Sequence, residues 1–321
     1  MGLGGLTMLG RTAASLFWMS RYIERAENIA RLTEVGYRIA LTPDIGSGHR
    51  EDWQSTLIAA ASLNAYQERH TNITAEKAQH FLLFDRDNPS SVRSCLETAR
   101  NNARAVRTAL TREMWEALNS TYIDFTAVKA SDLGSGKLPE FLDWVRQRSA
   151  LFRGSLLGTL LRDEGFHFGQ LGAFIERADN TARILDVKYY VLLPTNESVG
   201  GDLDAFQWET ILRSVSAHRS YRHVYKDRYR PWNIAEFLIL RQEMPRSFRF
   251  CYGWIERSLE GLSEILGQSS QSRHDASAIL SDLKNASMDE IFQSGLHEFL
   301  SAFIKRNNEL SNQIANDFHF L

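Results

Sequence analysis

Two stretches of this chain carry the same set of charged and amide side chains at helical spacing. In the first, Glu24, Asn28 and Arg31 are separated by four and then three residues, which puts them on one face of an α-helix. The second stretch repeats the pattern 152 residues later, and in both stretches an arginine directly follows the glutamate. The candidate functional cluster is therefore Glu24, Arg25, Asn28, Arg31, Glu176, Arg177, Asn180 and Arg183.

Carboxylate and guanidinium groups at this spacing allow three arrangements. Pairs such as Glu27 and Arg31 occur on solvated helices, where each contributes about 0.2–0.5 kcal/mol. Arginine also forms planar bidentate pairs, so the cluster could be a buried network between helices or a pocket that holds a carboxylate or phosphate of a ligand. In an enzyme, Glu24 or Glu176 would be the general base. Because the pattern occurs twice, we expect fixed partners rather than a solvated face.

A second candidate site is the basic segment 218–230, which carries five Lys or Arg residues and one Asp. Its tyrosines recur every four residues, and basic residues interleaved with aromatic ones can bind phosphates or stacked bases. The alternatives are a solvated helix end, a docking patch for a ligand or protein, and a nucleic-acid site. The formal net charge of −2 argues against a general nucleic-acid binder. The candidate anion-binding or docking patch is His218, Arg219, Arg222 and Lys226.

Other motifs give no sign of a cofactor. Glu164 and His167 form a Glu-x-x-His on a predicted helix, but a di-iron bundle needs that motif twice and the chain has it once. Cys95 and Cys251 have no neighbouring base, so we expect buried, unreactive thiols. No phosphate-binding loop, dinucleotide-binding glycine motif or nucleophile elbow is present. We therefore expect neither a metal nor a cofactor.

The elements that position these residues are predicted by apolar periodicity. Around each copy of the cluster, apolar residues step by three and four, which predicts two helices of about 25 to 30 residues. Alternation with a period of two is nearly absent, so strands are not expected. The other predicted helices cover 50–68, 91–109, 111–128, 139–162, 204–226, 233–242, 246–266, 273–285 and 289–317.

Two further matches follow the first in the same order along the chain. Trp53 corresponds to Trp208, and a Pro-x-Ser-x-Arg-x-Cys pattern that begins at Pro89 recurs from Pro245. Such collinear matches predict an internal duplication with halves at about 8–160 and 161–321. No linker separates them, so we expect one domain over 1–321: an all-α, compact bundle of about ten helices, built from two halves related by a pseudo-twofold axis.

Composition narrows the class of protein further. Hydrophobic residues make up 43% and charged residues 24% of the 321 residues, which is typical of a globular protein and excludes a disordered chain. Two cysteines are too few for a disulfide framework and indicate a reducing compartment. No apolar stretch approaches the roughly 20 residues that a membrane span needs. We expect a cytoplasmic protein without membrane contact.

Several of these motifs together resemble the bacterial alpha-E family, an all-helical domain with a Glu-Arg signature. The resemblance rests on Gly10-Arg11-Thr12-Ala13 and on the segment from Trp18 to Asn28, which contains Glu24-Arg25. It extends through 114–119, 212–219 and 235–240 and so spans essentially the whole chain. No catalytic residues are securely assigned in that family, so none can be carried over.

The resemblance implies a function through partners. Members of the family are typically encoded beside circularly permuted ATP-grasp-type proteins and transglutaminase-like peptidases, and ATP-grasp enzymes join a carboxylate to an amine. This implies a helical accessory or partner subunit of an amide or peptide ligase that does not itself bind nucleotide. The alternatives are an enzyme that uses the Glu-Arg cluster, and a module that binds a carboxylate or peptide ligand.

Overall fold

The computed structural model describes residues 8–41, 49–133, 136–192, 202–226 and 229–320. Within these ranges the chain forms fifteen α-helices, two short 3₁₀ segments (Arg107–Ala109 and Ala130–Leu133) and no strand, so the all-α prediction is confirmed. The helices up to the middle of the chain are α1 Gly10–Ala40, α2 His49–Ala59, α3 Leu63–Gln67, α4 Ala75–Leu83, α5 Val92–Ala105, α6 Arg112–Ala127 and α7 Leu138–Thr159. The remaining helices are α8 Glu164–Leu192, α9 Asp202–Ser214, α10 His218–Tyr225, α11 Pro231–Ile239, α12 Phe248–Leu266, α13 Gln271–Asn285, α14 Met288–Ser294 and α15 Leu296–Asp317.

The prediction of about ten helices was too low, because three predicted helices each divide in two. The divisions fall at residues with positive φ: Ala61 (51°) before α3, Ser216 (57°) before α10 and Gly295 (95°) before α15. A residue in the left-handed region ends a helix and turns the chain. In addition, α4 was not among the predicted helices.

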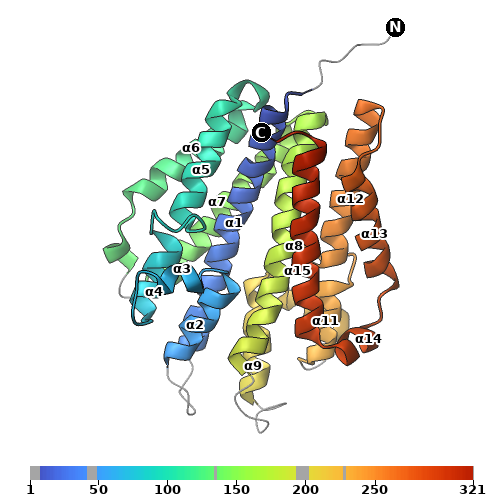
Figure 1. Cartoon of the computed structure of the whole chain (residues 1–321). Helices are drawn as coiled ribbons and strands as arrows, with labels where there is room; N and C mark the ends of the chain where they lie inside the picture. The colour runs from blue at the N-terminus through green and yellow to red at the C-terminus, as the bar shows by residue number, and fades with distance from the viewer. Residues whose placement is uncertain (1–7, 42–48, 134–135, 193–201, 227–228, 321) are drawn as a thin grey trace.

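The two long helices α1 and α8 lie side by side at the centre of the molecule (Figure 1). Helices α5 and α7 pack on α1, whereas α12 and α15 pack on α8. The buried apolar side chains form one cluster that extends from Ala13 to Ile314. Among the described helices, none has an apolar stretch long enough to cross a bilayer.

The two central helices approach each other closely at Gly172. A Cβ atom at this position would lie 2.1 Å from the carbonyl oxygen of Phe17 on α1, so only glycine fits the contact. Because both helices are surrounded by others, they bury polar as well as apolar faces, including the glutamates and arginines of the candidate cluster. The fold therefore places a charged surface inside the protein, where each charge needs a partner.

Helices α5 and α12, which flank α1 and α8, begin in the same way. Ser91 caps α5 by accepting a hydrogen bond from the Ser94 amide at 3.1 Å, and Ser247 caps α12 by accepting one from the Phe250 amide at 3.0 Å. Each serine hydroxyl also donates to the carbonyl oxygen of the residue six positions earlier. The residue immediately before the cap is Ser90 for α5 and Arg246 for α12.

Candidate functional site

The glutamate and arginine of each long helix pair with those of the other helix. Arg177 donates through Nε and Nη2 to the two carboxylate oxygens of Glu24, at 2.9 and 3.0 Å. Arg25 donates in the same bidentate manner to Glu176, at 2.7 and 2.9 Å. Each guanidinium group also lies over the aromatic ring of the residue three positions earlier on its own helix. Arg177 lies over Phe174, and Arg25 lies over Tyr22. The structure thus joins the four signature residues in two reciprocal bridges between α1 and α8.

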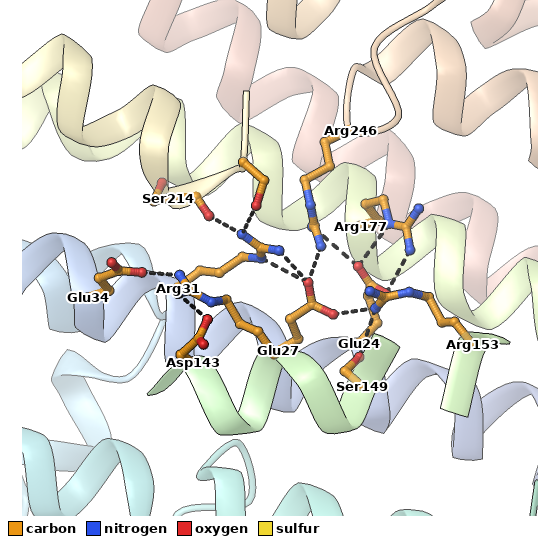
Figure 2. Close-up of polar contacts among 12 residues, drawn as sticks. Glu24, Glu27, Arg31, Glu34, Asp143, Ser149, Arg153, Arg177, Ser214 and Arg246 are labelled. Atoms are coloured by element: carbon orange, nitrogen blue, oxygen red, sulfur yellow. Dashed lines mark hydrogen bonds and ion pairs between the residues drawn. The ribbon is translucent and has the colours of Figure 1, made fainter. Parts of the chain in front are cut away.

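Glu27 forms the centre of a larger charged group, which Figure 2 shows together with Glu24. Arg31 donates to it at 2.9 and 2.6 Å from one turn further along α1, and Arg153 donates to it from α7. Arg246, from the loop before α12, donates to Glu27 and lies 3.3 Å from the nearer oxygen of Glu24. Two buried carboxylates therefore bind guanidinium groups from four separate parts of the chain.

These arginines hold the carboxylates in their charged form. Burial alone would raise the pKa of Glu24, but Arg177 and Arg153 outweigh it and lower the pKa to about 2. Burial likewise opposes ionisation of Glu176, and Arg25 and Arg21 bring its pKa down to about 2. The pKa of Glu27 is also lowered, because Arg246 and Arg31 outweigh its burial. Carboxylates with such pKa values are poor proton acceptors near neutral pH, so this geometry favours a structural network over general-base chemistry.

Arg246 is the most unusual member of the group. Its burial, and the nearby positive charge of Arg31, lower its pKa to about 9, although Glu27 and Glu24 act in the opposite direction. Neither Arg246 nor Arg153 was among the predicted site residues. For Arg246 a signal existed, since it stands between the matched Pro245 and Ser247 where the first half has Ser90. For Arg153 there was none, because nothing in its own segment marks it.

The remaining members of the predicted cluster lie on the opposite side of the central pair. Arg183 pairs with Asp179 at 2.6 Å, and the Asn28 amide donates to the carbonyl oxygen of Glu176 at 3.2 Å. Asn180 is only 2% exposed, yet neither atom of its amide has a hydrogen-bond partner among the described residues. These side chains surround a cavity of about 200 Å³ that also reaches Ser90 and the end of α2.

An open cleft of about 510 Å³ adjoins the Glu27 group, between α1, α7 and the turn that joins α9 to α10. Six arginines but only three carboxylates line it, so the surface carries an excess of positive charge. We call this the arginine cleft; its charged lining residues are Glu27, Arg31, Glu34, Arg38, Asp143, Arg146, Arg153, Arg213, His218 and Arg219.

The structure divides the predicted basic patch. His218 and Arg219 line the arginine cleft, whereas Arg222 and Lys226 are exposed further along α10 and do not line it. The His218 ring hydrogen-bonds Tyr229 at 2.7 Å, and partial burial and the nearby Arg213 lower its pKa. The cleft therefore brings part of the basic patch next to part of the Glu-Arg cluster, which the sequence did not predict.

The other candidate groups do not form a reactive site in the described part of the chain. Cys95 and Cys251 are fully buried as predicted, and burial raises the pKa of each thiol to about 12. Glu164 accepts a hydrogen bond from the Met8 amide at 2.8 Å. No three His, Cys, Asp or Glu side chains lie close enough together to hold a metal ion within the described ranges.

We expect Glu24→Gln to destabilise the protein strongly. The substitution removes the negative charge that Arg177, Arg153 and Arg246 share inside the protein, and breaking a buried ion pair by removing one partner costs about 3–5 kcal/mol. Urea unfolding would measure the loss. The control is Glu116→Gln, which removes an exposed pair with Arg112 and should change stability little. Equal effects of the two substitutions would contradict the buried network.

We also expect stability to fall in acid within a defined pH window. The pKa values of Glu24 and Glu176 are about 2 in the folded protein, below their ordinary value of 4.5. The two carboxylates therefore contribute their full stabilisation above pH 4.5. It is lost as the pH falls from about 4.5 towards 2, because the unfolded chain then binds more protons. The free energy of unfolding, measured in urea across this range, should decrease with falling pH. A flat profile would show that these carboxylates are not held ionised.

Comparison with known proteins places the chain in a family. A family model described as Alpha-E, a predicted alpha-helical domain with a conserved ER motif, matches residues 8–319. No curated protein matches the chain, and no solved structure does. The Glu-Arg pairs at 24–25 and 176–177 form the two reciprocal bridges described above, and the match covers nearly every residue that the structure describes. The chain belongs to the Alpha-E family.

Proposed function

We propose that this protein is a helical binding subunit, which holds a ligand carboxylate in the arginine cleft and works beside an ATP-grasp-type amide or peptide ligase. The observation that carries this proposal is the composition of the cleft, where six arginines face three carboxylates around about 510 Å³ of open space. Guanidinium groups recognise carboxylates through paired hydrogen bonds, which gives such a surface a clear preference for acidic ligands.

Part of the cleft is free to act on a ligand. Arg219 is exposed and makes no ion pair or hydrogen bond with another described residue. Arg213, with 48% of its side chain exposed, pairs with Glu209 at the surface. Arg31 and Arg153 at the base of the cleft are instead fixed by the Glu27 group. A ligand carboxylate would thus meet exposed arginines at the mouth of the cleft and arginines already paired with Glu27 behind them.

The role beside an ATP-grasp-type ligase rests on the resemblance of the chain and on what its sequence lacks. A ligase of that class supplies the nucleotide site and the acyl phosphate, and this chain has no nucleotide-binding motif of its own. A transglutaminase-like protein would be a second partner of the same system. The alternative, an enzyme with Glu24 or Glu176 as general base, is less well supported, because their arginine partners keep the pKa of both near 2.

We infer further that the two halves arose by duplication, as the sequence matches predict. The reciprocal bridges, the two serine caps and the positive φ at both Ala61 and Ser216 support this inference. In a duplicated domain, residues that differ between equivalent positions are the ones free to take on a binding role.

Carboxylate binding can be tested by titrating the full chain with a short glutamate-rich peptide, and with its glutamine counterpart as the uncharged probe. We expect the acidic peptide alone to bind, and more weakly as salt is added. Arg219→Ala should weaken binding by about tenfold, the value of one charge-assisted hydrogen bond. Arg112→Ala, which removes an exposed arginine on α6, is the matched control and should change nothing. Equal affinity for the two peptides would refute the proposal.

The partnership predicts a physical complex. Tagged protein purified from its native cells should retain an ATP-grasp-type protein, identified by mass spectrometry, and the two purified chains should associate at micromolar concentration. This chain alone should show no turnover of ATP. Absence of any complex under these conditions would count against the accessory role while leaving carboxylate binding untouched.

A further inference from the structure

The cavity between α1 and α8 on the side away from the arginine cleft has the features of an unfilled binding site. It measures about 200 Å³, and its polar lining comprises Arg25, Asn28, Ser90, Asp179, Asn180 and Arg183, together with Glu176. The side chains of Arg25 and Arg183 are 23% and 24% exposed, so the cavity can be reached from solvent. We call it the Ser90 cavity.

Side-chain amide groups without a hydrogen-bond partner among the described residues line this cavity. The amide oxygen of Asn28 has no partner among the described residues, although its nitrogen does. The Asn180 side chain has no hydrogen-bond partner among the described residues for either its amide oxygen or its amide nitrogen, although the residue is only 2% exposed. Buried amide groups are nearly always hydrogen-bonded in folded proteins, and leaving one unpaired costs about 1–3 kcal/mol. Asp179 adds a carboxylate that, within the described part of the chain, pairs with Arg183 alone, which leaves further acceptor capacity.

The equivalent place on the other side of the central helices is occupied by the protein's own Arg246. Ser90 and Arg246 each precede the serine that caps a flanking helix, Ser91 for α5 and Ser247 for α12. The Arg246 guanidinium enters the space beside the Glu24–Arg177 bridge and donates to Glu27. At the equivalent position beside the Glu176–Arg25 bridge, the short Ser90 side chain leaves that space empty.

Two other differences enlarge the Ser90 cavity. Ser216, at the positive-φ turn after α9, accepts a hydrogen bond from Arg31, whereas the matching turn after α2 has Ala61. Glu27 is matched by the shorter Asp179, which likewise pairs with the arginine four residues on. At three matched positions, therefore, the residue beside the Ser90 cavity is the smaller one, and at the position of Ser90 the group that is missing is a guanidinium.

We propose that the Ser90 cavity binds a guanidinium group of a ligand, which takes the position that Arg246 takes across the central helices. Its N–H groups would donate to Asp179 and to the amide oxygens of Asn28 and Asn180. The neighbouring arginines do not forbid this, because Arg246 is itself accommodated next to Arg31, Arg153 and Arg177. This site goes beyond the proposed carboxylate function and is separate from the arginine cleft.

The ligand's source is either a free alkylguanidine or an arginine side chain of a peptide, and the probes distinguish them. Calorimetric titration of the full chain would use butylguanidinium, butylammonium and pentanoate, which share an alkyl tail and differ in the head group. A capped Gly-Arg-Gly peptide would represent the second source. We expect butylguanidinium to bind and the other two small probes not to bind. Tighter binding of the peptide than of butylguanidinium would assign the site to arginine side chains; weaker binding would assign it to free alkylguanidines.

The decisive variant is Ser90→Arg, which should fill the cavity with an internal guanidinium as Arg246 does on the other side. It should weaken butylguanidinium binding by at least about tenfold while leaving the melting temperature no lower than that of the wild type. Ser90→Ala, the matched control, keeps the cavity open and should bind as the wild type does. If Ser90→Arg does not fold, Asp179→Asn serves as the second variant, and it should also weaken butylguanidinium binding because it removes the carboxylate that accepts from the guanidinium group.

Three results would overturn the proposal. Butylguanidinium that fails to bind at millimolar concentration would refute the site, and equal binding by wild type and Ser90→Arg would place it elsewhere. Pentanoate binding that is lost in Ser90→Arg would make the cavity an anion site. Arg219→Ala separates these failures from failure of the cleft, because it should not affect guanidinium binding.

Discussion

The structure depends on one constraint: carboxylates buried between α1 and α8 must be neutralised by guanidinium groups, above all by those that reach across from the opposite helix. Removing such charges from water is costly, and the cost is recovered only when paired hydrogen bonds have good geometry. Each bidentate bridge satisfies both oxygens of its glutamate, and the two bridges point in opposite directions. A slip of one helical turn, about 5.4 Å, would break both at once, so the bridges fix the register of the helices.

The two bridges have different surroundings, and a ligand can bind where these surroundings differ. On one side Arg153 and Arg246 complete the neutralisation of Glu24 and Glu27, and the Arg246 guanidinium occupies the place beside Glu27. On the other side Ser90 leaves a cavity next to the Glu176 bridge. One bridge therefore belongs to a network that an arginine completes, whereas a serine stands beside the other bridge. The difference resides in side-chain length just before a helix cap, a position that can change without altering the fold.

The long central helices and the meeting of 24–25 with 176–177 could be anticipated, because apolar periodicity and a repeated charge pattern are local signals. The contacts that could not be anticipated join residues that are far apart in the sequence. Arg153 reaches Glu27 across 126 positions from a helix with no distinguishing motif, so only the packing of α7 on α1 reveals it. The helix breaks at Ala61 and Ser216 were missed for another reason: left-handed turns usually use glycine or asparagine, and neither is present there.

A signature residue pair need not be the part of a protein that touches its ligand. Here the carboxylate oxygens of each glutamate in the Glu-Arg pairs accept hydrogen bonds from arginines of the same chain. Glu24 and Glu176 are also almost inaccessible to solvent. Such residues set the spacing of helices, and a change in them is expressed first as lost stability. Among the described residues, side chains with unused hydrogen-bonding capacity include Arg219 at the cleft, and Asn28 and Asn180 in the Ser90 cavity. Differences in ligand among proteins built on this scaffold should therefore follow these side chains rather than the Glu-Arg pairs themselves.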